Sequence, residues 1–187
     1  VTVTNQFGCD TVIVFDVSVD PFISTSFPDT INACFDQPTE LNPGGMAIAG
    51  YIYDWSPMNG DFSNPANPIV TVTMDQLYSV TITDPNTGCS ETDSVQVIVA
   101  PDLMFTPLST QDTSLCFPGD VTFMASAATN VVISWYDNIP FTPPPLSVGT
   151  DFTVSLIIDG QMETVYAEAI DTTTGCRDTL VFMAQLL

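Results

Sequence analysis

The chain has 187 residues, with 22 acidic side chains against one basic side chain, and its formal net charge is −21. It contains no histidine and no lysine, and Arg177 is the only base. These absences exclude Ser-His-Asp and Cys-His catalytic pairs, imidazole metal ligands, Schiff bases and phosphate-binding P-loops. One arginine cannot neutralise a nucleic-acid backbone, and the acidic chain would be repelled by an anionic membrane. We therefore expect no nucleic-acid partner.

The chain is nevertheless apolar, since 45% of its residues are hydrophobic and only 12% are charged. Such a composition favours a folded protein over a disordered one. No apolar run approaches the length of a membrane span, so we expect no membrane insertion by this segment. The sequence opens in the middle of a pattern, at residues 1–4 (Val-Thr-Val-Thr), with no signal peptide. We interpret it as a piece of a longer protein.

Alternation of apolar and hydroxyl residues predicts β-strands along the whole chain. Clear examples occupy residues 69–73, 78–83 and 151–156. Prolines and glycines, 15 and 10 of them, separate the runs. No stretch shows a convincing helical stripe, so the predicted fold class is all-β.

Internal repetition is the most informative feature of the sequence. A strand pattern, a Gly-Cys pair and a second strand pattern recur around Cys9, Cys89 and Cys176. Two further pairs of equivalent residues recur at a similar spacing: Cys34 with Cys116, and Trp55 with Trp135. The repeat unit is about 80–87 residues long, which suits a β-sandwich of about seven strands.

The repeat predicts a tandem array with short linkers. Residues 1–20 correspond to the last two strands of a preceding module. Residues 21–100 and 101–187 correspond to two complete β-sandwich modules.

The first complete module carries a recognisable pattern. It reads Tyr-Ile-Tyr-Asp-Trp-Ser-Pro at 51–57, then Asn-Pro at 67–68, a strand at 77–83, Gly-Cys at 88–89 and Asp-Ser-Val at 93–95. This pattern resembles the immunoglobulin-like (Ig-like) and PKD-like repeats of very large Bacteroidota cell-surface proteins. The resemblance covers both complete modules and the leading fragment, and implies that residues 1–20, 21–100 and 101–187 belong to Ig-like β-sandwich modules. The pattern departs from a PKD domain because no Phe-Gly-Asp-Gly turn follows Trp55.

The resemblance implies export by type IX secretion and an extracellular, cell-surface-attached location. It also implies a role in cell adhesion, as an adhesin, a gliding adhesin or the shaft of an appendage. It says nothing of a ligand.

Cysteine usage predicts disulfide bonds in an oxidising compartment. Because both pairs occupy equivalent places in the repeat, we expect the bonds Cys34–Cys89 and Cys116–Cys176, one within each module. Cys9 matches the second cysteine of each pair and should bond to a cysteine upstream. Since the cysteines of the second series follow a turn-like Thr-Gly, the bridge should lie at one end of the sandwich. A zinc site is disfavoured because the chain lacks Cys-x-x-Cys and histidine.

The two tryptophans have alternative interpretations. Trp55 and Trp135 fall on the expected third strand of their modules, where a tryptophan is more often a core residue than an exposed glycan-stacking ring. We favour the core.

The aspartates are scattered, mostly at turns, and form no Asp-x-Asp-x-Asp-Gly loop. We expect solvated carboxylates and no cofactor. The best calcium candidates are Asp16, Asp20 and Asp102, near the module junctions.

Three equivalent positions match the Asp-Ser/Thr-apolar acceptor pattern of Bacteroidota O-glycosylation. They are Thr11, Ser94 and Thr179. Simple strand alternation after the cysteine turn explains the same pattern.

Function follows from the array and the resemblance. We expect structural modules of a long secreted surface fibre, appendage or adhesin shaft used for attachment, and no enzyme activity. Surplus apolar residues at 103–105, 131–133 and 181–184 favour a multi-chain homo-oligomer packed side by side, such as a grappling-hook appendage. The alternatives are ligand-binding adhesin modules, with the Pro-rich segment 138–146 as the candidate loop, and accessory modules of a secreted enzyme.

Overall fold

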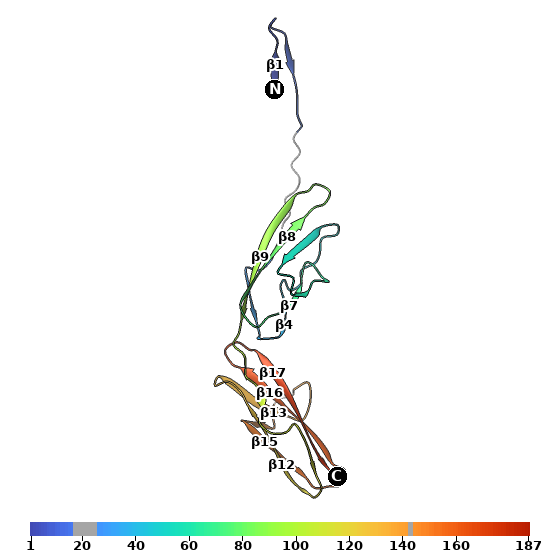
Figure 1. Cartoon of the computed structure of the whole chain (residues 1–187), viewed down its shortest axis with the longest axis vertical. Helices are drawn as coiled ribbons and strands as arrows, with labels where there is room; N and C mark the ends of the chain where they lie inside the picture. The colour runs from blue at the N-terminus through green and yellow to red at the C-terminus, as the bar shows by residue number, and fades with distance from the viewer. Residues whose placement is uncertain (17–25, 142–143) are drawn as a thin grey trace.

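The computed structural model describes residues 1–16, 26–141 and 144–187, and all of its long regular elements are β-strands (Figure 1). At the N-terminus, β1 (Thr2–Thr4) and β2 (Asp10–Val12) form an antiparallel hairpin. No helix in the described ranges is long and apolar enough to cross a membrane.

The first module consists of a four-stranded sheet, in the order β3-β9-β8-β5, and a three-stranded sheet, in the order β4-β7-β6. Its strands are β3 (Thr30–Ala33), β4 (Pro38–Glu40), β5 (Ile52–Ser56), β6 (Gly60–Asp61), β7 (Ile69–Thr71), β8 (Gln76–Thr83) and β9 (Ser90–Val99).

The core of this module follows directly from the period-two alternation of its strands. Tyr78, Val80 and Ile82 all lie on one face of β8 and are buried, while the hydroxyl residues between them face outward. Val95 and Val97 extend the same apolar layer on β9. Each such side chain contributes about 1.5–3 kcal/mol when it is removed from water.

The second module has a five-stranded sheet, in the order β11-β17-β16-β13-β14, and a three-stranded sheet, in the order β10-β12-β15. Its strands are β10 (Thr106–Pro107), β11 (Asp112–Leu115), β12 (Gly119–Ser126), β13 (Val131–Tyr136), β14 (Ser147–Val148), β15 (Asp151–Leu156), β16 (Met162–Asp171) and β17 (Arg177–Leu186). Its core centres on Trp135, whose ring lies 5.3 Å from that of Phe182.

In both modules the first strand of the larger sheet runs parallel to the last strand. Ala33 of β3 lies opposite Val99 of β9, and Leu115 of β11 lies opposite Leu186 of β17. The first strand and the last strand therefore end at the same end of the sandwich. The residue that follows the first strand lies beside the point where the chain leaves the module.

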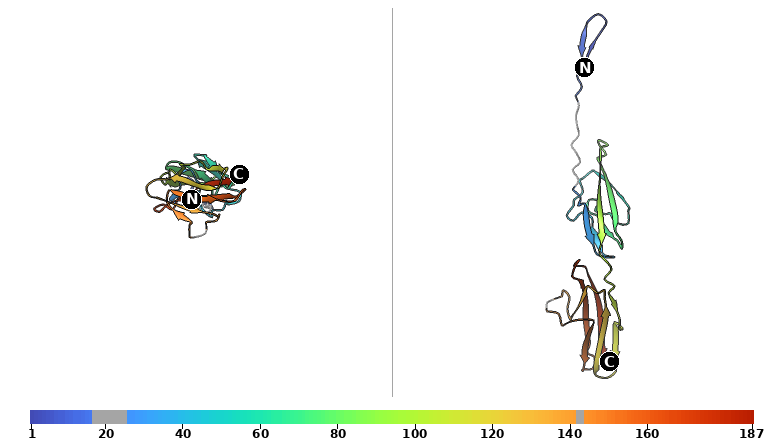
Figure 2. Two further views of the ribbon diagram at one scale, coloured as in Figure 1. Left: turned by 90° about the horizontal axis from the view of Figure 1, so that it is seen from below. Right: turned by 90° about the vertical axis from the view of Figure 1, so that its left-hand side faces the viewer.

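The two modules follow one another along the long axis of the molecule (Figures 1 and 2). Each has its own hydrophobic core. The connection is short: β9 ends at Val99, and the second module begins with Pro101. This arrangement brings the end of the first module against the β16–β17 turn of the second.

Candidate functional site at the module junction

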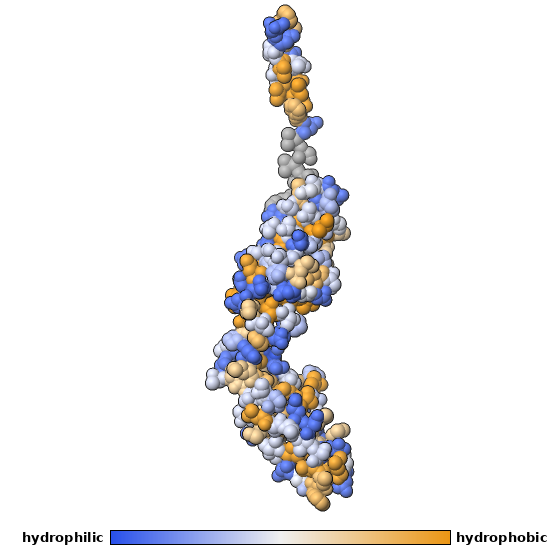
Figure 3. Space-filling model, viewed as in Figure 1, coloured by the Kyte–Doolittle hydropathy of each residue, from blue (hydrophilic) through white to orange (hydrophobic). Residues whose placement is uncertain are grey.

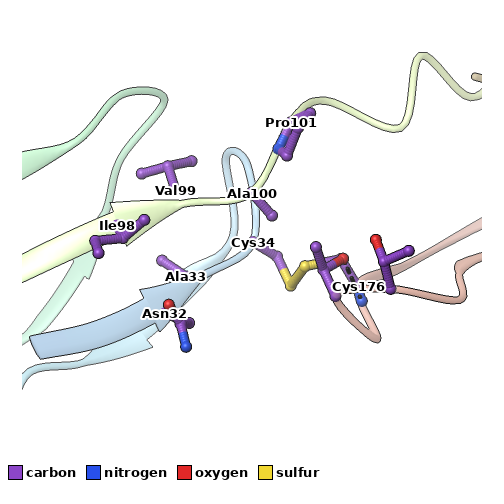
Figure 4. Close-up of a pocket in the computed structure, with 10 residues that line it drawn as sticks. Asn32, Ala33, Cys34, Ile98, Val99, Ala100, Pro101 and Cys176 are labelled. Atoms are coloured by element: carbon purple, nitrogen blue, oxygen red, sulfur yellow. Dashed lines mark hydrogen bonds between the residues drawn. A yellow bond between two sulfur atoms is a disulfide. The ribbon is translucent and has the colours of Figure 1, made fainter.

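A disulfide bond joins the two modules. Cys34 follows β3 in the first module, and Cys176 precedes β17 in the second; their Cα atoms are 5.5 Å apart and their sulfurs 2.06 Å apart. The close-up of the junction shows this bond beside Ala100 and Pro101, the residues that connect the modules (Figure 4). The junction therefore has two covalent connections, the chain and the disulfide.

The expected bonds within each module are wrong. Cys34 is bonded to Cys176, whereas Cys89 and Cys116 are free in this chain. Cys89 precedes the first residue of β9, and Cys34 lies beside the last. The 10 residues of β9 span about 33 Å at 3.3 Å per residue, whereas the Cα atoms of a disulfide lie less than about 7 Å apart.

The same geometry separates the cysteines of the second module. Cys176 precedes β17 and Cys116 lies beside its end, at Leu186. The two cysteines of each module thus lie at opposite ends of the sandwich. The bond does lie at an end of each sandwich, but it connects neighbouring modules. Cys9 is also free and exposed in the described residues, so its bond to an upstream cysteine stays a prediction.

A tight turn between β16 and β17 presents Cys176 to the first module. The backbone N–H of Asp171 donates to the carbonyl of Cys176 at 2.9 Å, and that of Gly175 donates to the carbonyl of Asp171 at 2.8 Å. Gly175 adopts a φ of 76°, a conformation that favours glycine. The Asp171 carboxylate accepts bonds from the hydroxyl and the backbone N–H of Thr173, at 2.6 and 2.7 Å.

These bonds lower the pKa of Asp171 below its ordinary value. The Thr173 hydroxyl is the largest cause, followed by the Thr173 backbone N–H, and bonds from the Thr174 backbone and the Asn130 amide act in the same direction. Burial opposes them. Asp171 therefore stays ionised and acts as the anionic anchor of the turn.

The single arginine supports the same turn from the other side. Arg177 donates from Nη1 to Oε1 of Glu168 at 2.8 Å, and the Glu168 side chain is only 4% exposed while that of Arg177 is 63% exposed. A buried carboxylate such as that of Glu168 needs a cationic partner, and Arg177 provides it. The Arg177 carbonyl also accepts a hydrogen bond from Nε2 of Gln37 in the first module, at 2.5 Å. Sequence analysis did not identify Gln37 or Glu168 as residues of the junction.

A cleft of about 410 Å³ lies beside the disulfide. Its lining comes from both modules: Asn32, Ala33, Cys34, Ile98, Val99, Ala100, Pro101, Thr173, Thr174 and Cys176 (Figure 4). These residues offer amide and hydroxyl groups and apolar surface but no carboxylate. The cleft is a gap between packed modules and holds no acid–base pair.

The calcium candidates are not brought together. Asp16 is exposed in the N-terminal segment, and Asp102 accepts a hydrogen bond from the Met104 backbone N–H at 2.8 Å, as a turn residue does. Asp20 lies outside the described residues. Within those residues, no three acidic or cysteine side chains gather as a metal site.

The O-glycosylation candidates share one structural setting. Thr11 in β2, Ser94 in β9 and Thr179 in β17 are all exposed on strands. Modification of these residues stays a prediction.

The two tryptophans lie in the cores. Trp55 is 3% exposed and Trp135 is 0% exposed. Each indole N–H donates to a backbone carbonyl, Trp55 to Pro65 at 2.8 Å and Trp135 to Gly149 at 2.9 Å. Neither ring offers a face to a glycan.

The segment expected as a binding loop, residues 138–146, lies between β13 and β14. Within it, Ile139 and Leu146 are exposed, and Phe141 packs against Tyr136 with ring centroids 4.7 Å apart. Residues 142–143 lie outside the described residues.

No family model and no curated protein matches the chain. Among solved structures it is similar to three N-terminal domains of the bacteriophage RB49 outer capsid protein Hoc, at 16% identity and a TM-score of 0.39, covering 74% of this chain and 49% of that one. It is also similar to a chimeric titin Z1Z2 tandem, at 11% identity, a TM-score of 0.37 and coverages of 87% and 98%. The first four Ig domains of Dscam1 isoform 6.9 match at 8% identity, a TM-score of 0.37 and coverages of 91% and 48%.

The chain spans about half the length of the Hoc and Dscam1 chains that it matches. Similarity at these scores transfers no function. The sheet orders and the paired cores establish the architecture directly: the chain is a tandem of Ig-like β-sandwich modules joined across their junction by a disulfide.

Proposed function

We propose that these modules are structural segments of an extracellular, surface-attached fibre or adhesin shaft that serves cell adhesion. The observation that carries the proposal is the Cys34–Cys176 bond across the junction. Cys176 belongs to the core of the second module and Cys34 packs against that core, so the bond fixes the first module to the second and limits bending at the connection. A shaft needs resistance to bending, whereas an array of independent binding modules does not need it.

The disulfide also supports the extracellular location, because disulfides persist in oxidising compartments. The resemblance to Bacteroidota surface repeats supports export by type IX secretion. We propose no catalytic role and no resident cofactor for these modules, since the cleft at the junction is lined without a carboxylate.

We further propose that the shaft is multi-chain, a homo-oligomeric filament of copies packed side by side. Large apolar side chains are exposed on both modules, among them Ile98, Val181 and Met183 at 41–44%. Figure 3 shows hydrophobic surface over both modules, interspersed with hydrophilic residues. The charge of −21 opposes association. Salt screens solvated carboxylates beyond roughly 8–10 Å, while burial of apolar surface is not screened.

Electron microscopy of the intact, natively secreted protein tests the proposal. We expect an elongated shaft in which modules are stacked end to end and several chains run side by side. A compact particle with a catalytic domain would overturn the structural role. A single-chain rod at physiological salt, seen also by light scattering, would overturn the multi-chain arrangement alone.

A ligand-binding role is the second candidate. It rests on the exposed Ile139 and Leu146 of the segment that has no counterpart of the same kind in the first module. Binding of the chain to host or prey surfaces, lost on replacement of both residues by serine with the fold intact, would favour it.

A further inference from the structure

We propose that Cys34–Cys176 is one member of a staggered series of bonds. In this series, the cysteine after the first strand of each module bonds to the Gly-Cys turn of the module that follows. Cys116 then bonds forward to a module placed after Leu187. Cys89 bonds to the forward-facing cysteine of the module that ends at residue 20. Cys9 bonds to the forward-facing cysteine of the module that precedes that one. The inference rests on the geometry of the repeat and not on the proposed function.

The forward-facing cysteines have equivalent surroundings. Cys34 follows β3 and Cys116 follows β11, and both strands run parallel to the last strand of their module. The backbone N–H of Ala100 donates to the carbonyl of Ala33, and that of Leu187 donates to the carbonyl of Leu115, both at 2.8 Å. Cys116 therefore lies beside the exit of the second module, as Cys34 lies beside the exit of the first.

The receiving turns are equally similar. In the first module the N–H of Asp84 donates to the carbonyl of Cys89 at 2.9 Å, and that of Gly88 donates to the carbonyl of Asp84 at 2.8 Å. These are the distances found in the Cys176 turn. Gly88 and Gly175 share a φ of 76°. The N–H of Cys89 donates to the Thr87 hydroxyl at 3.2 Å, as that of Cys176 does to the Thr174 hydroxyl at 3.3 Å.

The N-terminal hairpin repeats this turn with one residue fewer. The N–H of Asn5 donates to the carbonyl of Cys9 and that of Gly8 donates to the carbonyl of Asn5, both at 3.0 Å, and Gly8 has a φ of 80°. Cys9 is therefore presented as Cys176 is. The three cysteines differ in burial. Cys176, which is bonded to the first module, is only 5% exposed, whereas Cys9 and Cys89 are exposed.

The spacing in the sequence places the next junction. Ala100 follows Cys89 at the same distance along the chain as Leu187 follows Cys176 and Asp20 follows Cys9. Pro101 comes after Ala100, and Pro21 comes after Asp20. A module that begins at Pro21 can thus be joined directly to Leu187 in the register of the natural junction.

The bond forms by thiol–disulfide exchange with a small-molecule disulfide such as oxidised glutathione. One cysteine thiolate attacks the glutathione disulfide, forms a mixed disulfide and releases one glutathione thiolate. The second cysteine thiolate then attacks the protein sulfur of the mixed disulfide and releases the other. The two cysteines lose two electrons and two protons, and one oxidised glutathione becomes two reduced molecules.

A fusion protein tests the series with this chain alone. The full chain is followed, after Leu187, by a second copy of residues 21–187. Cys9→Ser and Cys89→Ser in the first copy, together with Cys116→Ser in the second, leave one forward-facing and one receiving cysteine at the new junction. After oxidation with glutathione, cleavage at Asp and Glu separates every cysteine onto its own peptide. Mass spectrometry should find Cys116 of the first copy bonded to Cys89 of the second, with no free thiol.

The Cys34–Cys176 bond of each copy reports that the modules have folded. Free thiols at Cys116 and at Cys89 of the second copy, with both Cys34–Cys176 bonds present, would overturn the proposal. So would a bond from Cys89 to Cys34 within one module. Peptide mapping of the natively secreted protein is the second measurement, and there Cys116 must be linked to a cysteine that lies beyond Leu187, since a Cys116–Cys176 bond would contradict the series.

Discussion

Cys34 and Cys176 are 142 residues apart in the sequence and form a disulfide that crosses from the first Ig-like module to the second. The bond closes a loop that contains most of both modules. It therefore links the orientation and the unfolding of the two sandwiches, which the chain also connects through Ala100 and Pro101.

Cys34→Ser should uncouple the two modules. In the loop-entropy model a closure of this length stabilises the folded state by about 5 kcal/mol. We expect the variant to unfold at lower temperature, in two calorimetric transitions where the oxidised chain shows one, and small-angle scattering should report a wider range of inter-module angles.

Cys89→Ser is the matched control for this experiment. Cys89 forms no disulfide in this chain, so its replacement should leave both the calorimetric trace and the scattering unchanged. An identical response to both substitutions would contradict a coupling role for the disulfide.

Arg177→Gln should destabilise the second module by about 2 kcal/mol, the typical value of a hydrogen bond to a charged group. The substitution leaves the carboxylate of Glu168, 4% exposed, without its cation. Adding Glu168→Gln removes the uncompensated charge and should recover most of the loss. Urea unfolding of the parent, the single variant and the double variant measures both effects, and a double variant no more stable than the single one would show that the charge is not the cause.

Trp135→Ala should destabilise the second module by about 3–5 kcal/mol, as other large-to-small aromatic replacements in cores do. Trp135 is fully buried, and its ring contacts Phe152 and Phe182. Leu146→Ala, at an exposed position, should change the free energy of unfolding by less than about 0.5 kcal/mol. Chemical denaturation compares the two variants directly.

The ionised Asp171 should make the second module sensitive to acid. Its pKa is lower in the folded protein than the ordinary value of 3.8. Its stabilising contribution is therefore fully present above about pH 3.8 and is lost as the pH falls through the lower folded pKa. Asp171→Asn should unfold at lower temperature than the parent at neutral pH, and the difference should shrink toward pH 2.

Thr173→Val provides an independent check of that cause, because the Thr173 hydroxyl is the largest contributor to the lowered pKa. The variant should be less stable than the parent at neutral pH but should lose less stability as the pH falls below about 3.8, because its folded pKa lies closer to the unfolded value. If the variant and the parent lost the same amount of stability in acid, the Thr173 hydroxyl would not be the cause of the lowered pKa of Asp171.

Several features were predictable because they depend on neighbours in the sequence. Alternating apolar residues in 78–83 indicate a half-buried strand, and β8 buries Tyr78, Val80 and Ile82 on one face. The repeated Gly-Cys pairs indicate turns, and Gly88 and Gly175 do adopt the positive φ of a turn. The aspartates were expected at turns, and Asp84, Asp171 and the related Asn5 each accept a backbone N–H bond just before a Gly-Cys pair.

The strands, the Gly-Cys turns and the unit of repetition could be predicted from the sequence, because each arises from contacts within a few residues or from a visible period. The cysteine pairing could not be predicted in this way. Pairing depends on which end of the sandwich each cysteine occupies, and that depends on the parallel packing of β3 against β9 and of β11 against β17. Parallel pairing joins strands that are distant in the sequence. The parallel pairing of β3 with β9 therefore places Cys34 and Cys89 near opposite ends of β9, and it brings Cys34 to the Gly-Cys turn of the next module.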